Sequence, residues 1–120
     1  MATQVLVVDD ESVTRRVVTH ALQKLDIEVV GAADGASAID LAEQHDIALA
    51  IVDINLPDMD GFAVIQQLKS IAHMQDVPVI VFTARNQPGD KVTAQEVGAV
   101  DFLYKPFSTQ ELRDLVTKHL

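Results

Sequence analysis

The stretch Val5-Leu6-Val7-Val8-Asp9-Asp10-Glu11 decides the fold, because a short apolar run ends abruptly in three acids. An unbroken apolar run bounded by polar residues is typical of a strand that is buried on both faces of a parallel sheet. Residues 47–52 form a second such run, which ends at Asp53, and residues 79–82 form a third, which ends at Thr83. The sequence therefore places polar groups directly after its most apolar strands.

Helical patterns separate the strands along the whole chain. The expected strands cover residues 5–8, 27–30, 47–52, 79–82 and 100–104. The residues expected to face inward from the helices are Val13, Val17, Ala21, Leu22 and Leu25; Ile39 and Ala42 in a helix at 36–45; Phe62, Ile65, Leu68 and Ala72; Val92 and Val97 in a helix at 90–97; and Leu112, Leu115 and Val116. Gly98 is expected to end the fourth helix, and the capping box Ser108-x-x-Glu111 to begin the fifth. Five strand–helix repeats predict one α/β domain over residues 1–120, with a parallel sheet covered by helices on both faces.

Two charged residues indicate the order of the strands. Glu28 interrupts the second strand and Asp101 the fifth, which suits strands at the edges of the sheet. The unbroken apolar runs suit its centre. This pattern predicts a doubly wound, flavodoxin-like sheet of order 2-1-3-4-5, in which ligands bind beyond the carboxyl ends of the strands.

Composition excludes several classes of protein. The 120 residues include 9 Lys and Arg against 18 Asp and Glu, a net charge of −9, which disfavours direct binding to nucleic acid or to an anionic membrane. There is no cysteine for a disulfide or a thiol nucleophile, and the four histidines lack zinc-site spacing. The first residues lead straight into a strand without a signal peptide, and no apolar run is long enough to span a membrane. We therefore expect a cytoplasmic protein.

Polar side chains at four strand ends are expected to converge on one rim of the sheet. The strand ends are Asp9-Asp10-Glu11, Asp53-Ile54-Asn55, Thr83-Ala84 and Lys105-Pro106. Taken singly, each has an ordinary structural explanation, such as a helix cap for Asp10 and Glu11. Taken together, the carboxylates would repel one another unless a hard cation bound them, and Mg²⁺ prefers oxygen ligands.

The same residues suit the transfer of a phosphoryl group. Asp53 is the expected nucleophile, since a carboxylate can accept a phosphoryl group covalently. Mg²⁺ would bridge Asp53 to Asp10, and Asp9 would bind as a second ligand or through water. The phosphoryl oxygens would contact Lys105, the Thr83 hydroxyl and the Ala84 N–H.

These motifs resemble the signature of CheY-like response-regulator receiver domains. The fragments that carry the resemblance are Val7-Val8-Asp9-Asp10-Glu11, Val52-Asp53-Ile54-Asn55-Leu56-Pro57-Asp58-Met59-Asp60-Gly61, Thr83-Ala84 and Lys105-Pro106-Phe107. They occur in the family's order and spacing over essentially the whole chain. The resemblance implies a phospho-accepting switch of two-component signalling, phosphorylated at Asp53 with Mg²⁺, that is a signalling domain and not an enzyme.

The resemblance also implies roles that the residues alone do not reveal. Asp10, Asp53 and the backbone carbonyl of Asn55 would bind the metal, with Asp9 assisting. Thr83 and Phe102 would form the switch, and the Lys105–Pro106 bond would be cis. The donor would be a histidine kinase or a phosphotransfer protein, and the residues expected to contact it are Thr14, Arg15, Val18 and Phe107.

The output surface would consist of residues 90–97, 100–104 and the last helix, which would change on phosphorylation to control an unknown effector. Receivers of the OmpR/PhoB type dimerise through this surface with a set of ion pairs. Lys91, Asp101 and Glu111 fit that set. Leu115, however, stands where that subfamily has an arginine, and Arg113 lies two positions too early. The sequence thus predicts a monomer or a weak dimer.

Two other functions stay open at this point. A small phosphatase of the haloacid dehalogenase type also phosphorylates an aspartate, but its motif resembles Asp-x-Asp after the first strand, where this chain has adjacent Asp9-Asp10. A receiver fold that serves only as an unphosphorylated interaction module is the second. Such relatives usually lose an acid or the lysine, and this chain keeps both.

Overall fold

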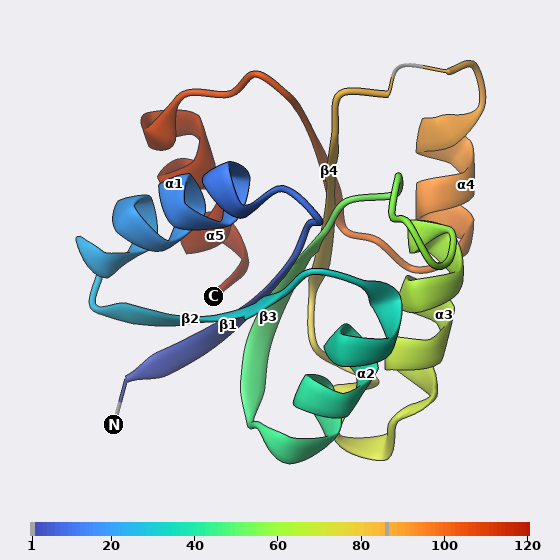
Figure 1. The fold of residues 1–120 in the computed structure, drawn as a ribbon, viewed down its shortest axis with the longest axis horizontal. Coiled ribbons are helices and arrows are strands. Elements are labelled where there is room, and N and C mark those ends of the chain that lie inside the picture. Colours follow the sequence, from blue (N-terminus) through green and yellow to red (C-terminus); the bar gives the residue numbers. More distant parts are fainter. Residues whose placement is uncertain (1, 86) are drawn as a thin grey trace.

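Five parallel strands form one sheet in the order β2-β1-β3-β4-β5, as predicted. The computed structural model, which describes residues 2–85 and 87–120, contains β1 (Thr3–Val8), β2 (Ile27–Ala32), β3 (Ile47–Val52), β4 (Val79–Thr83) and β5 (Asp101–Tyr104). The helices are α1 (Ser12–Gln23), α2 (Gly35–Gln44), α3 (Gly61–Ser70), α4 (Asp90–Glu96) and α5 (Thr109–His119), with a short 3-10 helix, η1 (Ala72–Met74). Because the strands all run in one direction, their carboxyl ends share one edge of the sheet (Figure 1).

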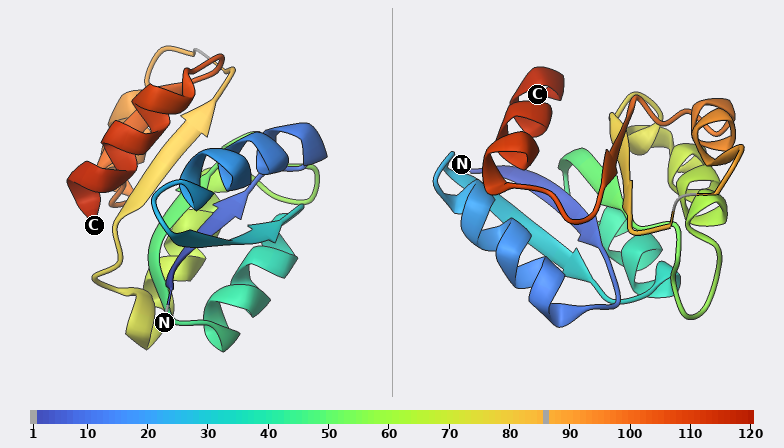
Figure 2. Two further views of the ribbon diagram at one scale, coloured as in Figure 1. Left: turned by 90° about the vertical axis from the view of Figure 1, so that its left-hand side faces the viewer. Right: turned by 90° about the horizontal axis from the view of Figure 1, so that it is seen from above.

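Helices cover both faces of the sheet. α1 and α5 lie on one face, and α2, α3 and α4 lie on the other (Figures 1 and 2). Alternate residues of β1 contribute to two separate cores: Val5 and Val7 pack with α1 and α5, whereas Leu6 and Val8 pack with the other three helices. Each fully buried side chain of this kind stabilises the fold by about 1.5–3 kcal/mol, which explains why residues 5–8, 47–52 and 79–82 of the central strands are all apolar.

Side chains at the helix ends explain where several helices begin and end. Asp34 and Asp60 each accept a hydrogen bond from a backbone N–H in the first turn of α2 and α3, respectively. The capping box of Ser108 and Glu111 at the start of α5 is confirmed. Gly98 follows the end of α4 with a φ of 96°, a left-handed conformation that favours glycine, so the predicted stop is also confirmed.

The predicted inward face of α1 is partly wrong. Val13, Val17 and Leu25 are exposed, by 65%, 42% and 39%. The buried residues of the helix are Val18, Ala21 and Leu22. Adjacent helical residues point about 100° apart, so burial of Val18 against the sheet turns Val17 towards solvent.

The predicted inward residues of α3 and α4 need a similar correction. Val92 is 57% exposed, because it lies two residues from both Asp90 and Ala94, which form the buried face of α4. Ala72 is exposed, because α3 ends at Ser70 and Ala72 belongs to η1.

A membrane span requires about 20 apolar residues in a helix. Within residues 2–85 and 87–120, no helix combines the length and the apolar character needed to cross a bilayer.

Candidate functional site

Three aspartates gather at the carboxyl ends of β1 and β3. Asp9, Asp10 and Asp53 each offer a carboxylate oxygen within 4.8 Å of the others, as the strand order predicted. Asp9 and Asp53 are buried, whereas Asp10 is exposed. The pairing of the two strands continues to this edge, where the Asp53 N–H donates to the Val8 carbonyl at 2.9 Å.

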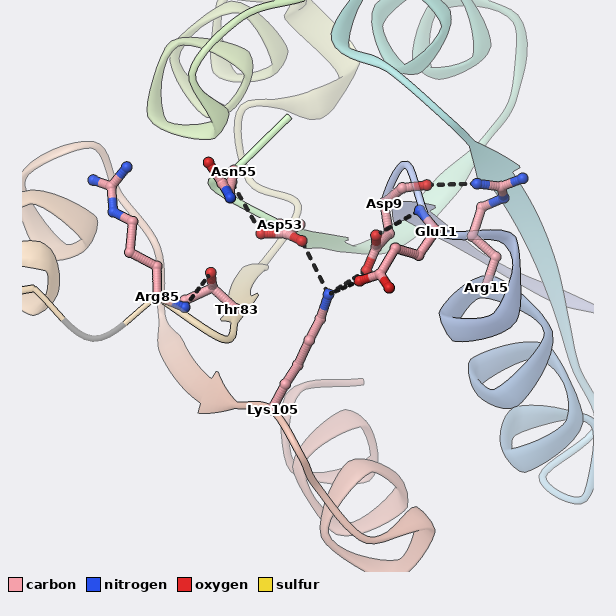
Figure 3. A network of polar contacts seen from close by, with 8 residues as sticks. All are labelled: Asp9, Glu11, Arg15, Asp53, Asn55, Thr83, Arg85 and Lys105. Atoms are coloured by element: carbon pink, nitrogen blue, oxygen red, sulfur yellow. Dashed lines mark hydrogen bonds and ion pairs between the residues drawn. The ribbon is translucent and has the colours of Figure 1, made fainter. Parts of the chain in front are cut away.

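Lys105 joins the two buried carboxylates from the far side of the site. Its Nζ lies 2.5 Å from Oδ2 of Asp9 and 3.0 Å from Oδ2 of Asp53 (Figure 3). Oε1 of Glu11 lies 3.7 Å from the same ammonium, a contact that the sequence did not predict. The bond between Lys105 and Pro106 is cis, as predicted. One lysine thus neutralises groups that follow two different strands.

Burial and ion pairing act in opposite directions on Asp9 and Lys105. Burial raises the pKa of Asp9 above its usual value and outweighs the hydrogen bonds from Lys105 and from the Glu11 N–H. Burial alone would lower the pKa of Lys105, but the hydrogen bonds to Asp9 and Asp53 outweigh it and raise the pKa. The lysine is therefore secured as an ammonium, and a further cation would favour the charged form of Asp9.

Backbone N–H groups bind the remaining carboxylate oxygens. Oδ1 of Asp53 accepts a hydrogen bond from the Asn55 N–H, and Oδ1 of Asp9 accepts one from the Glu11 N–H, both at 2.9 Å. Both oxygens of each buried carboxylate therefore have a donor. This fixes the orientation of the two side chains before any ligand arrives.

Gly61 allows α3 to begin directly beneath Asp53. A Cβ atom at this position would lie 2.3 Å from Cα of Ile54 and 2.4 Å from the carbonyl oxygen of Asp53. Both neighbours are backbone atoms that cannot move aside cheaply. Only glycine permits this close approach of the two backbone segments. The approach lets the Gly61 N–H donate a hydrogen bond to the Ile54 carbonyl at 3.0 Å.

Of the two residues expected to form the switch, Thr83 is the last residue of β4 and Phe102 lies in β5. Thr83 is buried, and its Oγ1 accepts a hydrogen bond from the Arg85 N–H at 3.0 Å. Its carbonyl accepts one from the Lys105 N–H at 2.9 Å. Ala84 is exposed. Phe102 is half-buried against the core, and its ring lies 4.8 Å from that of Tyr104.

An ion pair that the sequence did not predict joins Arg85, which follows β4, to Asp90, the first residue of α4. The Arg85 guanidinium donates to both carboxylate oxygens of buried Asp90, at 3.0 and 3.2 Å. Its carbon lies 5.9 Å from the centre of the Phe62 ring, and Asp60 is 4.0 Å away. The hydrogen bond to Arg85 lowers the pKa of Asp90. The five-residue spacing of the two charges was the only signal available in the sequence.

Asp58 links the loop after β3 to α2. Its two carboxylate oxygens accept hydrogen bonds from the Gly35 and Ala36 N–H groups, at 2.9 and 3.2 Å. The hydrogen bond from Gly35 contributes most to lowering the pKa of Asp58. The loop that carries Asn55 is therefore anchored to α2 through Asp58, which the sequence did not reveal.

The donor atoms of this site suit a hard divalent cation. The three clustered side chains offer only carboxylate oxygens, the ligands that Mg²⁺ prefers. The exposure of Asp10 leaves room for the water molecules that Mg²⁺ usually retains.

Comparison with known proteins decides the family. The sequence model of the response regulator receiver domain family matches residues 5–117 of this chain. The chain belongs to this receiver domain family. The family serves two-component signalling and comprises signalling domains rather than conventional enzymes.

Relatives and solved structures agree with this assignment. The receiver is 37% identical over 109 residues to the probable transcriptional regulator ycf27 of Porphyridium aerugineum, a match covering 91% of this chain and 44% of that protein. It is 38% identical over 112 residues to the regulatory protein VanRc of Enterococcus gallinarum. This match covers 93% of this chain and 47% of that protein. The receiver thus spans less than half the length of these relatives.

Two solved structures show the same fold. The chemotaxis protein CheY4 of Vibrio cholerae matches over all of both chains, with a TM-score of 0.95 and 32% identity. The receiver domain of the sensor histidine kinase PA1611 of Pseudomonas aeruginosa PAO1, described with a magnesium ion coordinated in its active site cleft, covers 99% of this chain and 98% of its own. Its TM-score is 0.89, with 28% identity.

One residue expected to contact a phosphoryl donor is unavailable in this receiver. Val18 is fully buried, because it belongs to the stripe of α1 that packs on the sheet. The Arg15 side chain turns back towards the site. Thr14 and Phe107 do line a surface groove of about 390 Å³, together with Val13, Val17, Pro106 and neighbouring residues.

The residues that fit a dimer ion-pair set have partners within the receiver itself. Asp101 lies 3.0 Å from Nε2 of His119 and 3.7 Å from Nζ of Lys118. Glu111 belongs to the capping box, and the Lys91 ammonium lies 5.3 Å from the centre of the Tyr104 ring. Any dimer through α4, β5 and α5 would compete with these contacts.

Proposed function

We propose that this receiver accepts a phosphoryl group on Asp53 from a histidine kinase or a phosphotransfer protein. The observation that carries the proposal is the Lys105 ammonium, 3.0 Å from Asp53 and at the edge of an acidic cluster. The lysine neutralises the acceptor at rest and can follow the negative charge onto the phosphoryl oxygens after transfer.

The proposed reaction replaces one bond to phosphorus by another. A carboxylate oxygen of Asp53 attacks phosphorus, and the P–N bond of the donor phosphohistidine breaks. The imidazole leaves with the electron pair and takes up a proton from water. We assign Lys105, the Thr83 hydroxyl and the Ala84 N–H to the oxygens of the resulting aspartyl phosphate.

We assign Asp10, Asp53 and the backbone carbonyl of Asn55 to a bound Mg²⁺, with Asp9 assisting. The ion, when bound, would offset the negative charge of the carboxylates and of the incoming phosphoryl group. The purely oxygen donor set supports this assignment. So does the magnesium ion described in the PA1611 receiver, to which this chain is similar.

Phosphorylation by a small-molecule donor tests the acceptor. With acetyl phosphate and Mg²⁺, we expect intact-mass spectrometry to show one phosphoryl adduct on the wild-type chain and none on Asp53→Ala. Asp46→Ala, which removes an exposed acid between α2 and β3, should behave as wild type. An adduct that persists in Asp53→Ala would refute the acceptor assignment.

We also propose that the phosphoryl group shifts a two-state switch formed by Thr83 and Phe102. The Thr83 hydroxyl would leave the Arg85 N–H for a phosphoryl oxygen, and Phe102 would move into the space vacated. Phe102 has no hydroxyl, so its burial leaves no polar group unpaired. The resulting change in α4, β5 and α5 would be the signal read by an effector.

Amide NMR with beryllofluoride, which mimics a phosphoryl group, tests this switch. We expect chemical-shift changes to extend from the site through residues 84–104. Phe102→Ala should shorten that range while leaving shifts around Asp53 intact. Changes confined to the loops of the site would place the switch elsewhere.

A further inference from the structure

We infer that Arg15 is a positioning residue for the proposed metal site, because its guanidinium fixes the peptide group that joins Asp9 to Asp10. The inference rests on the proposed function, in which Asp10 is a ligand of Mg²⁺. It gives Arg15 a role that the sequence did not predict, in addition to the expected contact with a signalling partner.

Arg15 reaches back from α1 to the end of β1. Its Nη1 donates to the carbonyl oxygen of Asp9 at 2.6 Å (Figure 3). Its aliphatic stem crosses β2 at Gly31, where a Cβ atom would lie 3.5 Å from Cδ of Arg15. A hydrogen bond from a charged donor is about twice as strong as a neutral one, so this contact can determine the orientation of a single peptide group.

After Asp10, the segment is anchored by the hydrogen bond from the Glu11 N–H to Oδ1 of Asp9. α1 begins after Glu11, whose side chain makes no capping hydrogen bond. Asp10 itself is exposed. The Asp9 N–H, by contrast, donates to the Ala32 carbonyl at 3.0 Å, and both carboxylate oxygens of Asp9 are bonded.

The geometry of the peptide bond transmits this anchoring to Asp10. A peptide group is planar, so the position of the Asp9 carbonyl oxygen sets the direction in which N and Cα of Asp10 leave. With the Asp9 N–H bonded to β2 and its carbonyl bonded to Arg15, the backbone on both sides of Asp9 is fixed. The Asp10 carboxylate is then directed towards Asp53, and both groups can bind one ion.

Charge and positioning predict opposite results when Arg15 is removed. If Arg15 acted only as a nearby positive charge, its loss would strengthen the binding of a divalent cation. If Arg15 orients Asp10, its loss weakens binding, because one ligand is no longer held in place. The sign of the change in Mg²⁺ affinity therefore separates the two explanations.

The experiment is a calorimetric titration of the metal-free chain with Mg²⁺. Arg15→Met keeps the stem over β2 and removes the donor, and we expect it to bind Mg²⁺ roughly tenfold more weakly, as for other residues that orient metal ligands. Arg15→Lys, which restores a charged donor, should recover part of the loss. Arg16→Met is the matched control, because Arg16 is the adjacent, exposed arginine of the same helix.

A double-mutant cycle tests whether Arg15 acts through Asp10. In an Asp10→Asn background, Arg15→Met should cause no further loss of Mg²⁺ affinity. Thermal unfolding without Mg²⁺ checks that each variant is folded. If Arg15→Met does not fold, the Mg²⁺ affinity of Arg15→Lys is compared with that of Arg16→Lys instead.

The outcomes distinguish this inference from the proposed function. If the wild-type chain binds Mg²⁺ through Asp10 and Arg15→Met binds it equally well or more tightly, the positioning role is overturned and the metal site stands. If the wild-type chain does not bind Mg²⁺, or if Asp10→Asn binds it as well as wild type, the proposed metal site fails and the inference fails with it.

Discussion

The acceptor region, formed by Asp9, Asp53 and Lys105, and the surface of α4 and β5 are stabilised in different ways. In the acceptor region, the side chains are buried or nearly so and bonded at every carboxylate oxygen. On the α4–β5 surface, the seven residues of α4 bury only Asp90 and Ala94. This surface leaves large side chains exposed: Val92, Val100 and Tyr104.

If phosphorylation moves α4, as we propose, this difference explains how the receiver combines a precise site with a movable surface. Short polar contacts and close backbone approach make the acceptor region costly to distort. α4 buries only Asp90, which pairs with Arg85, and Ala94, so we expect a modest free energy to be enough to displace it. The following changes test that contrast, from the largest expected effect to the smallest.

Gly61→Ala should destabilise the fold most. Its Cβ would overlap backbone atoms of Ile54 and Asp53, so we expect the free energy of unfolding to fall by about 3 kcal/mol or more. Urea unfolding followed by circular dichroism measures the loss. Gly31→Ala is the control: its Cβ would make ordinary contacts with Arg15, and stability should change by less than about 0.5 kcal/mol. Equal effects of the two substitutions would contradict the close backbone contact of Gly61 with Asp53 and Ile54.

Asp90→Asn should have an intermediate effect that depends on pH. The hydrogen bond from Arg85 lowers the pKa of Asp90 in the folded state. The carboxylate therefore stabilises the fold above its unfolded pKa of about 3.9, and the contribution is lost as the pH falls through the folded-state pKa. We expect Asp90→Asn to lose about 1–3 kcal/mol at neutral pH.

Urea unfolding at a series of pH values checks this prediction. The difference in stability between wild type and Asp90→Asn should shrink as the pH falls below about 4. Glu96→Gln, which neutralises an exposed acid on the same helix, should show little difference at any pH. A difference for Asp90→Asn that stays constant across this range would show that the ion pair does not secure α4.

Val92→Ser should have the smallest effect. The side chain is 57% exposed, so its replacement should change the free energy of unfolding by less than about 0.5 kcal/mol. Ala94→Ser, on the buried face of the same helix, should cost more. If Val92→Ser proved the more destabilising of the two, α4 would have to pack differently from the structure described.

The sequence allowed the sheet and the meeting of Asp9, Asp10, Asp53 and Lys105 to be predicted, because unbroken apolar runs mark central strands and parallel strands end at one edge. It did not reveal which side of α1 is buried. Val17 and Val18 are equally apolar, and only packing against the sheet distinguishes them.

The polar contacts between loops were also beyond sequence reasoning. Asp58 caps α2 from 23 residues away, and nothing in its local sequence marks that partner. From the sequence, Asp90 would be expected to be an exposed acid at the start of a helix. In the structure it is buried, because Arg85 pairs with it. Such contacts depend on how loops approach one another, which apolar periodicity does not encode.

The contact between Lys105 and Asp9 joins residues that lie 96 positions apart in the chain. During synthesis, the three aspartates emerge long before the lysine that neutralises two of them. Until the chain beyond β5 has been made and has docked, those acids lack their cation and α5 is absent from its face of the sheet. A nascent or truncated chain therefore presents the acceptor aspartate without the group proposed to hold its phosphoryl oxygens. If Asp53 is the acceptor, as we propose, only a chain that extends past β5 is expected to be phosphorylated efficiently.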